Sequence, residues 1–182
     1  MGRPKLLLDW GGAPVIRRAA EGLLAAGVDP VLVVVGPSHE EISRALAGLP
    51  VRLVVNPTPE AGLGSSLGAG IRALPPGTGA AVVALGDQPE VPAGVIPALL
   101  AALEAPGKTI AAPRYADGLG NPVLFAASIF AELLGLPGDH GARAVVERDP
   151  RRLAVVDIAL PMPADLDTPE DYERLRRPDN PR

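Results

Sequence analysis

The stretch Ala80-Ala-Val-Val-Ala-Leu-Gly-Asp-Gln-Pro89 joins a run of apolar residues to a glycine, a carboxylate and a proline. A short, continuous apolar run that ends in turn residues is typical of a strand covered on both faces, as strands of parallel sheets are. Ligands of open parallel sheets bind beyond the carboxyl ends of the strands. The stretch therefore predicts an α/β fold in which Asp87 lies at the ligand-binding edge of the sheet.

The rest of the chain alternates between apolar runs of this kind and segments with helical spacing of apolar residues. Strands are predicted over 31–35, 51–55, 80–85, 109–112, 122–125 and 153–158. Helices are predicted over 14–26, 38–46, 65–74, 92–103, 127–134, 142–148 and 168–175. This alternation predicts a three-layer α/β sandwich on a mainly parallel sheet. We expect a single domain over residues 1–176, followed by a frayed tail over 177–182.

The composition excludes several classes of protein. The chain has 182 residues, with 21 Asp and Glu against 17 Lys and Arg, and a net charge of −4. This mild acidity argues against a nucleic-acid surface, which needs clustered positive charge. The apolar runs are far shorter than the ~20 residues that cross a bilayer. The absence of cysteine excludes disulfides, thiolate catalysis and Cys-ligated zinc. We expect a cytoplasmic protein that binds neither nucleic acid nor a membrane.

Two groups of carboxylates could hold a divalent cation. Mg²⁺ is usually held by one or two carboxylates, with substrate phosphates and waters completing its shell. Asp87 follows a predicted strand, whereas Asp165 and Asp167 lie two residues apart and would point to the same side of an extended segment. Each group also has a structural alternative. Asp87 could stabilise a turn beside Pro89, and one of the pair could cap the helix that begins at Thr168.

The loop Glu60-Ala-Gly-Leu-Gly-Ser-Ser-Leu-Gly68 leads into a predicted helix. Free N–H groups at a helix start and two hydroxyls favour an anion or nucleobase contact, although small residues could equally serve close packing against the sheet. The loop lacks the Gly-Lys-Ser/Thr of a Walker motif and the third glycine of the dinucleotide fingerprint. It also contains the Gly-x-Ser-x-Gly pattern of esterases, with Ser66, Asp87 and His140 in triad order. That interpretation is disfavoured because no strand runs directly into Ser66.

Six motifs follow one another along nearly the whole chain. They are Met1-Gly-Arg-Pro-Lys-Leu-Leu-Leu8, Gly62-Leu-Gly-Ser-Ser-Leu67, Gly86-Asp-Gln-Pro89, Gly120-Asn-Pro-Val-Leu-Phe125, Gly138-Asp-His-Gly-Ala-Arg143 and Asp165-Leu-Asp-Thr-Pro-Glu-Asp-Tyr172. In this combination the sequence resembles the MobA-like nucleotidyltransferases, most closely their molybdenum cofactor cytidylyltransferase branch. The resemblance implies a Rossmann-like fold that transfers a nucleoside monophosphate from an NTP, with CTP favoured, to a molybdopterin-type acceptor and releases pyrophosphate. Mg²⁺ is the implied cofactor, and a molybdoenzyme could be a partner.

The resemblance also implies roles for individual residues. Lys5 corresponds to the family's basic phosphate contact and Asp87 to its Mg²⁺ ligand, so these two are the implied catalytic residues. The implied nucleotide-binding residues are Gly2, Lys5, Asn56, Gly62, Ser65, Ser66 and Asp87. The implied acceptor-binding residues are Gly120, Asn121, Pro122, Asp165 and Asp167, of which Asp167 would also be a metal ligand.

One departure from the family concerns the amino terminus. Members of the family begin with a strand that ends in Leu-Ala-Ala-Gly-x-Ser-x-Arg, directly before the segment that matches Met1–Lys5. We expect either an undetected start upstream or a shortened form. We therefore expect a sheet with a gap, an unpaired edge or a partner chain that fills it, and weak or absent catalysis by this chain. A MobA-like guanylyltransferase, an enzyme with another acceptor and a catalytically silent cofactor-binding module are the alternatives.

Overall fold

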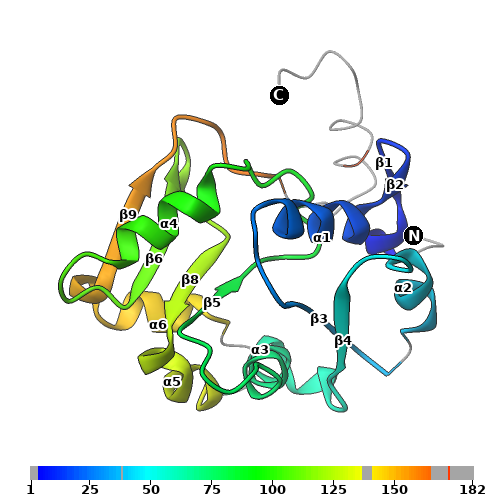
Figure 1. Ribbon diagram of the computed structural model, residues 1–182, viewed down its shortest axis with the longest axis horizontal. Coiled ribbons are helices and arrows are strands. Elements are labelled where there is room, and N and C mark those ends of the chain that lie inside the picture. The colour runs from blue at the N-terminus through cyan, green and yellow to red at the C-terminus, as the bar shows by residue number, and fades with distance from the viewer. Residues whose placement is uncertain (1–3, 38, 137–140, 165–171, 173–182) are drawn as a thin grey trace.

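The computed structural model describes residues 4–37, 39–136, 141–164 and 172, and Figure 1 shows the course of the chain. Its helices are α1 (Val15–Ala25), α2 (Glu40–Ala45), α3 (Leu63–Arg72), α4 (Val95–Leu103), α5 (Phe130–Leu134) and α6 (Arg143–Arg148). Its short 3-10 helices are η1 (Lys5–Leu7), η2 (Pro59–Ala61), η3 (Ala127–Ile129) and η4 (Pro150–Arg152). Its strands are β1 (Asp9–Trp10), β2 (Ala13–Pro14), β3 (Val31–Val35), β4 (Val51–Val55), β5 (Ala80–Val83), β6 (Ile110–Tyr115), β7 (Gly118–Leu119), β8 (Val123–Ala126) and β9 (Leu153–Asp157).

The predicted strands and helices that fall within the described residues are all present, with ends shifted by a few residues. The helix predicted over 168–175, apart from Tyr172, and the tail predicted over 177–182 lie outside the described residues. Sequence reasoning missed the β1–β2 hairpin and β7, because strands of two residues carry no periodic pattern. The hairpin turns at Gly11 and Gly12, whose φ angles of 61° and 86° favour glycine.

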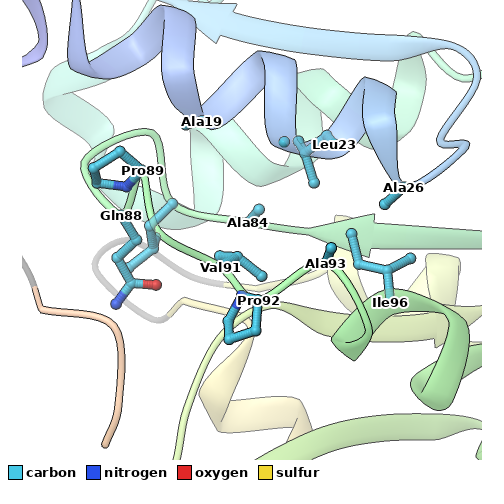
Figure 2. Close-up of a pocket in the computed structure, with 12 residues that line it drawn as sticks. Ala19, Leu23, Ala26, Ala84, Gln88, Pro89, Val91, Pro92, Ala93 and Ile96 are labelled. Atoms are coloured by element: carbon cyan, nitrogen blue, oxygen red, sulfur yellow. The ribbon is translucent and has the colours of Figure 1, made fainter. Parts of the chain in front are cut away.

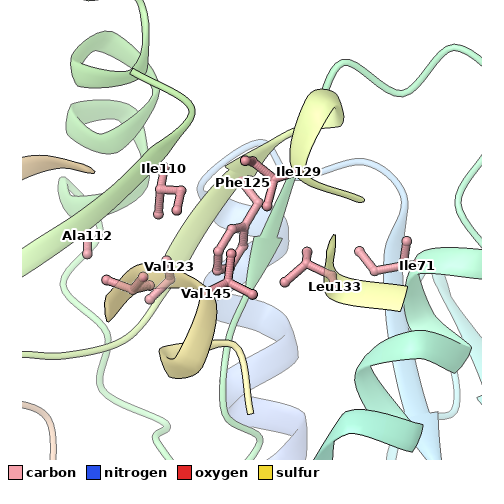
Figure 3. Packing of buried hydrophobic residues seen from close by; sticks show 9 residues of the cluster. Ile71, Ile110, Ala112, Val123, Phe125, Ile129, Leu133 and Val145 are labelled. Atoms are coloured by element: carbon pink, nitrogen blue, oxygen red, sulfur yellow. The ribbon is translucent and has the colours of Figure 1, made fainter. Parts of the chain in front are cut away.

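The side chains of β6 and β8 build a core on each face of the sheet. Val123 and Phe125 of β8 contact the layer of α3, α5 and α6, whereas Leu124 between them contacts α4 on the other face. Ile110 and Ala111 of β6 alternate in the same way, because successive strand residues point to opposite faces. Figure 3 shows the fully buried Phe125 within the larger cluster. The predicted three-layer α/β arrangement is confirmed.

The strands form two main groups. β8 pairs antiparallel with β5 on one side and with β6 on the other, and β6 pairs in parallel with β9 and antiparallel with β7. β3 and β4 form a separate parallel pair. Helices α1 and α2 pack against one face of this pair, and α3 packs against the other. No helix among the described residues is long and apolar enough to cross a membrane.

The expected gap separates the β3–β4 pair from the sheet that contains β5. Within the described residues β3 pairs only with β4, and β5 pairs only with β8. Helix α3 bridges the two groups, since its Gly70 lies against Val34 of β3 and its Ile71 belongs to the core cluster that β5 adjoins. Val31 of β3 is buried but residues 32–35 are half-buried, although the apolar run predicts a fully covered strand. A strand with a neighbour on one side only leaves its other edge accessible.

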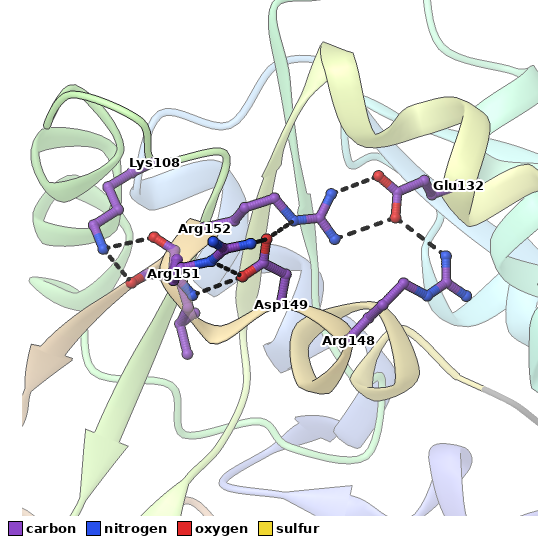
Figure 4. A network of polar contacts seen from close by, with 7 residues as sticks. Lys108, Glu132, Arg148, Asp149, Arg151 and Arg152 are labelled. Carbon is purple, nitrogen blue, oxygen red and sulfur yellow. Dashed lines mark hydrogen bonds and ion pairs between the residues drawn. The ribbon is translucent and has the colours of Figure 1, made fainter.

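Charged side chains join α5 to α6 and η4 (Figure 4). The carboxylate of Glu132 accepts hydrogen bonds from Arg152, with Nη1 2.6 Å from Oε1, and from Arg148, with Nη1 3.2 Å from Oε2. These guanidinium groups lower the pKa of Glu132, chiefly through the hydrogen bond from Arg152. The three side chains therefore tie together segments that close one face of the larger core.

Glu132→Gln should lower stability in a pH-dependent manner. A pKa that is lower in the folded state means that the ion pairs stabilise the fold above the unfolded pKa, and that this contribution is lost as the pH falls through the folded pKa. Because the pairs are partly exposed, we expect a loss of up to about 1 kcal/mol at pH 7. The difference from wild type should shrink as the pH falls below about 4.

Urea unfolding at a series of pH values would measure this difference. Glu104→Gln is the matched control, because Glu104 is exposed and the same charge is removed. A difference between wild type and Glu132→Gln that is constant with pH would contradict the electrostatic explanation.

Candidate functional site

Asp87 follows β5 at the carboxyl end of that strand, as the sequence predicts. The preceding Gly86 allows a close approach, because a Cβ atom there would lie 2.7 Å from Cδ1 of Ile16 in α1 and 3.7 Å from Cδ2 of Leu6 in η1. Glycine at this position therefore lets the amino-terminal segment lie directly against the end of β5.

The same segment carries Lys5, whose Nζ lies 2.6 Å from Oδ2 of Asp87. The Asp87 side chain is 16% exposed and the Lys5 side chain is 35% exposed. A carboxylate that is mostly removed from water needs a compensating charge, and the ammonium group of Lys5 supplies it. The two residues implied as catalytic are thus in direct contact, although 82 positions separate them in the chain.

Gln88 connects this site to the segment that follows β9. Its side chain is 2% exposed, and its Nε2 donates to the carbonyl oxygen of Pro163 at 3.3 Å. Sequence reasoning gave Gln88 no role, although it lies within the quoted Gly86–Pro89 motif. A glutamine directly after a candidate ligand is a weak signal, because its burial depends on a segment 75 residues away.

Asn56 organises the predicted nucleotide loop from within. It follows β4, and its side chain is buried, with only 2% exposed. Its Nδ2 donates to Oγ of Ser65 at 2.8 Å and to Oγ of Ser66 at 3.1 Å, and its Oδ1 accepts from the N–H of Thr58 at 3.1 Å. Ser65 in turn donates to the carbonyl oxygen of Gly62 at 2.8 Å. The side chain of Asn56 therefore lies beneath the loop that begins α3.

Residues Gly120, Asn121 and Pro122 form the connection from β7 to β8, with a cis bond between Asn121 and Pro122. The hydroxyl of Tyr115 donates to the carbonyl oxygen of Asn121 at 2.9 Å. Burial raises the pKa of Tyr115 to about 12, so the phenol keeps the proton that it donates. Sequence reasoning missed Tyr115, since nothing in its neighbourhood predicts a contact across the β6–β7 hairpin.

The antiparallel register brings this connection to the edge that carries Asp87. Val83, the last residue of β5, is paired with Val123, the first residue of β8. Residues just before Val123 therefore lie beside those just after Val83. The structure thus brings the candidate acceptor residues to the carboxyl end of β5, as expected for an open α/β sheet.

The carboxylate of Asp87 suits a hard divalent cation. Within the described residues no cluster of three or more Asp, Glu, His or Cys side chains gathers to hold a metal ion. A cation at Asp87 would therefore take most of its ligands from phosphates and water. This is how Mg²⁺ is usually bound in nucleotide sites, so the residues present fit such an ion.

Several predicted residues fall outside the described part of the chain. They are Gly2, His140, Asp165 and Asp167. Of the esterase triad Ser66, Asp87 and His140, the two residues that the structure describes do not support an esterase. Ser66 lies inside α3, η2 separates that helix from β4, and Asp87 is paired with Lys5. A nucleophile elbow requires a strand that leads directly into the serine.

A shallow hollow lies between α1 and the segment that joins β5 to α4 (Figure 2). Its walls are mostly apolar, with Leu23 on α1 facing Val91 and Ile96 on the other side, and Gln88 is the polar side chain at its edge. Neither Lys5 nor Asp87 lines it. A triphosphate needs cations and N–H donors, so this hollow is not the phosphate site.

The matches to known proteins agree with this geometry. The profile of the MobA-like NTP transferase domain matches residues 1–153, so the chain belongs to that family. It is 30% identical to the purine catabolism protein PucB of Bacillus subtilis, over 97% of this chain and 90% of that protein. It is also 30% identical to the nicotine blue oxidoreductase of Paenarthrobacter nicotinovorans, over 94% of this chain and 87% of that protein.

Solved structures support the same assignment. Rv0371c of Mycobacterium tuberculosis in complex with manganese superposes with a TM-score of 0.84 and 28% identity, covering 95% of this chain and 91% of that one. A nucleotidyl transferase from Methanothermobacter superposes with a TM-score of 0.79 and 31% identity, covering 94% and 83%. The protein therefore has the nucleotidyltransferase fold, and its family supports an enzymatic role with a nucleotide and an acceptor as substrates.

Gly120→Ala should destabilise the candidate acceptor connection. A Cβ atom at Gly120 would lie 2.9 Å from Cδ2 of the Tyr115 ring and 3.1 Å from Cε of Met162. The Tyr115 ring is buried and cannot easily move, so we expect a loss of about 1–3 kcal/mol in chemical unfolding. Gly22→Ala is the control. A Cβ atom at Gly22, within α1, would contact no neighbouring atom, so this change should stabilise the protein by about 0.5–1 kcal/mol. Equal effects of the two changes would exclude the steric explanation.

Asn56→Ala should loosen the loop that begins α3. The change removes three hydrogen bonds and leaves the N–H of Thr58 without its acceptor, so we expect a loss of about 1–3 kcal/mol. Hydrogen exchange over residues 58–66 should also become faster. Ser66→Ala removes only one of these bonds and should have a smaller effect on both quantities. If Ser66→Ala matches Asn56→Ala, then Asn56 does not organise the loop.

Proposed function

We propose that the protein is a Mg²⁺-dependent nucleotidyltransferase that transfers a nucleoside monophosphate from an NTP, with CTP favoured, to a molybdopterin-type molybdenum cofactor. The observation that carries the proposal is the contact between Lys5 and Asp87 at the carboxyl end of β5. It places the ammonium group proposed to bind phosphate beside the carboxylate proposed to bind the metal ion, within a chain of the MobA-like family. The manganese in the similar Rv0371c structure supports a divalent cation.

The proposed reaction needs no nucleophile from the protein. A terminal phosphate oxygen of the acceptor attacks the α-phosphorus of the NTP. The bond from that phosphorus to the oxygen bridging to the β-phosphate breaks, and pyrophosphate leaves. The bound cation would neutralise charge on the phosphates. Lys5 would stabilise negative charge on the leaving pyrophosphate, so positioning and electrostatics would supply most of the rate.

Other parts of the chain would orient the two substrates. The hydroxyls and N–H groups of residues 62–66, at the start of α3, would contact the nucleotide, with Gly2 and Asn56 contributing to the same site. The Gly120–Pro122 connection would contact the acceptor, together with Asp165 and Asp167, of which Asp167 would also serve the cation. The proposal treats residues 1–176 as a single cytoplasmic domain, with a molybdoenzyme as a possible recipient of the product.

A catalytically silent cofactor-binding module is the alternative from another class. Such a module would bind the pterin without binding an NTP. A guanylyltransferase would instead prefer GTP over CTP, and an enzyme with another acceptor would leave molybdopterin unused.

Asp87→Asn should abolish the Mg²⁺-dependent part of nucleotide binding. A ligand that binds only the folded state raises the melting temperature by mass action. We expect CTP with Mg²⁺ to raise the melting temperature of the wild-type chain more than GTP or ATP does. Asp87→Asn should remove that increase, because an amide is a poor ligand for a hard cation. Asp157→Asn is the control, because Asp157 is an exposed, arginine-paired carboxylate on β9.

Three results would contradict the proposal. Pterin binding without any NTP binding would favour the silent module, and a larger shift with GTP would favour the guanylyltransferase. An equal loss in Asp87→Asn and Asp157→Asn would show that Asp87 is not a specific ligand. Release of pyrophosphate from CTP only when a molybdopterin-type acceptor is added would test the reaction itself.

A further inference from the structure

We propose that Lys5 opposes divalent-cation binding at Asp87 until an NTP is bound, so that the cation and the nucleotide enter the site together. The inference rests on the proposed function, which assigns Asp87 to the cation and Lys5 to the phosphates. It adds that the ammonium group of Lys5 pairs with Asp87 when no NTP is bound, and with the phosphates when an NTP is bound.

The contact between Lys5 and Asp87 is the starting point. Nζ of Lys5 lies 2.6 Å from Oδ2 of Asp87, and the carboxylate is the more buried of the two groups. A divalent cation bound to this carboxylate would lie within a few ångströms of the ammonium group. Like charges at that separation repel strongly near a protein surface, where the effective dielectric constant is far below that of water. Without an NTP, a divalent cation must therefore either displace the ammonium group of Lys5 or bind despite its repulsion.

A triphosphate removes this obstacle. Its oxygens offer Lys5 a new anionic partner and offer the cation additional ligands. Lys5 has a flexible four-carbon stem, so the ammonium group can move from the carboxylate to a nearby phosphate without a large change in the backbone. Because Asp87 is then left to the cation, each ligand makes binding of the other more favourable. Such coupling must be reciprocal.

Removal of the ammonium group distinguishes this role from simpler ones. If Lys5 were only a phosphate contact, its loss would weaken NTP binding and leave binding of the cation alone unchanged. If Lys5 were only a structural partner of Asp87, its loss would weaken both. Under the proposal, Lys5→Met binds the cation alone more tightly and the NTP more weakly. The two affinities then change in opposite directions.

Mn²⁺ is a suitable probe, because the electron paramagnetic resonance signal of the free ion measures the bound fraction. In titrations without nucleotide, we expect Lys5→Met to bind Mn²⁺ about tenfold more tightly than the wild type, as the loss of one nearby positive charge allows. Addition of CTP should raise the Mn²⁺ affinity of the wild type by a larger factor than that of Lys5→Met. In the wild type, Mn²⁺ should raise CTP affinity by the same factor as CTP raises Mn²⁺ affinity.

Three control variants assign the effect. Lys5→Arg keeps the positive charge and should bind Mn²⁺ alone as weakly as the wild type. Lys108→Met removes the other lysine, which donates to the carbonyl oxygens of Arg151 and Leu153, and it should leave Mn²⁺ binding unchanged. It therefore tests whether net charge alone explains the result. Asp87→Asn in the Lys5→Met background should abolish the gained affinity.

The outcomes separate failure of the inference from failure of the proposed function. Mn²⁺ that binds with CTP, but no more tightly to Lys5→Met than to the wild type in its absence, would overturn the inference alone. So would wild-type affinities for Mn²⁺ and CTP that are independent of each other. Absence of Mn²⁺ binding to every variant, with or without CTP, would overturn the metal site and with it the proposed function.

Discussion

The pairing of β8 between β5 and β6 is the interaction on which the rest of the structure depends. β8 runs antiparallel to both neighbours, and its Phe125 is completely buried. Its alternating side chains reach both helical layers, so one strand of four residues joins the two cores. The reversal of direction also has a consequence for the site. It places the start of β8 at the edge where β5 ends, and so brings the Gly120–Pro122 connection to the side of Asp87.

Three polar side chains of this protein, Asn56, Tyr115 and Asp87, are largely buried beside a partner that compensates for lost water. Asn56 is almost completely buried and uses both ends of its amide on the loop that begins α3. Tyr115 keeps its proton and donates it to a backbone carbonyl. The charge of the Asp87 carboxylate is compensated by the ammonium group of Lys5. Two of these contacts hold loops in place, and the third is the one that the proposed function assigns to the substrates.

The pattern of apolar residues predicted most of the strands and helices, because short apolar runs such as Val31–Val35 and Val51–Val55 leave a strong local signal. It did not predict the β1–β2 hairpin, whose two-residue strands are too short to show alternation. Nor did it predict the half-burial of β3, because the run of valines is the same whether a strand has one neighbour or two. The number of neighbouring strands cannot be read from a local run of residues, because neighbours in a sheet come from distant parts of the chain.

In the candidate site too, the sequence predicts the residue types, whereas the fold determines their contacts. The residue types themselves, a lysine near the start and an aspartate after an apolar run, predict a phosphate contact and a ligand for a hard cation, because charge and ligand hardness belong to the side chain. The family followed from the order of the motifs, which is also a property of the sequence. That Lys5 reaches Asp87, that Gln88 holds Pro163 and that Tyr115 holds Asn121 was decided only by the tertiary structure. Such contacts depend on packing and register between separate segments, and no local pattern encodes a distance of a few ångströms across 82 residues.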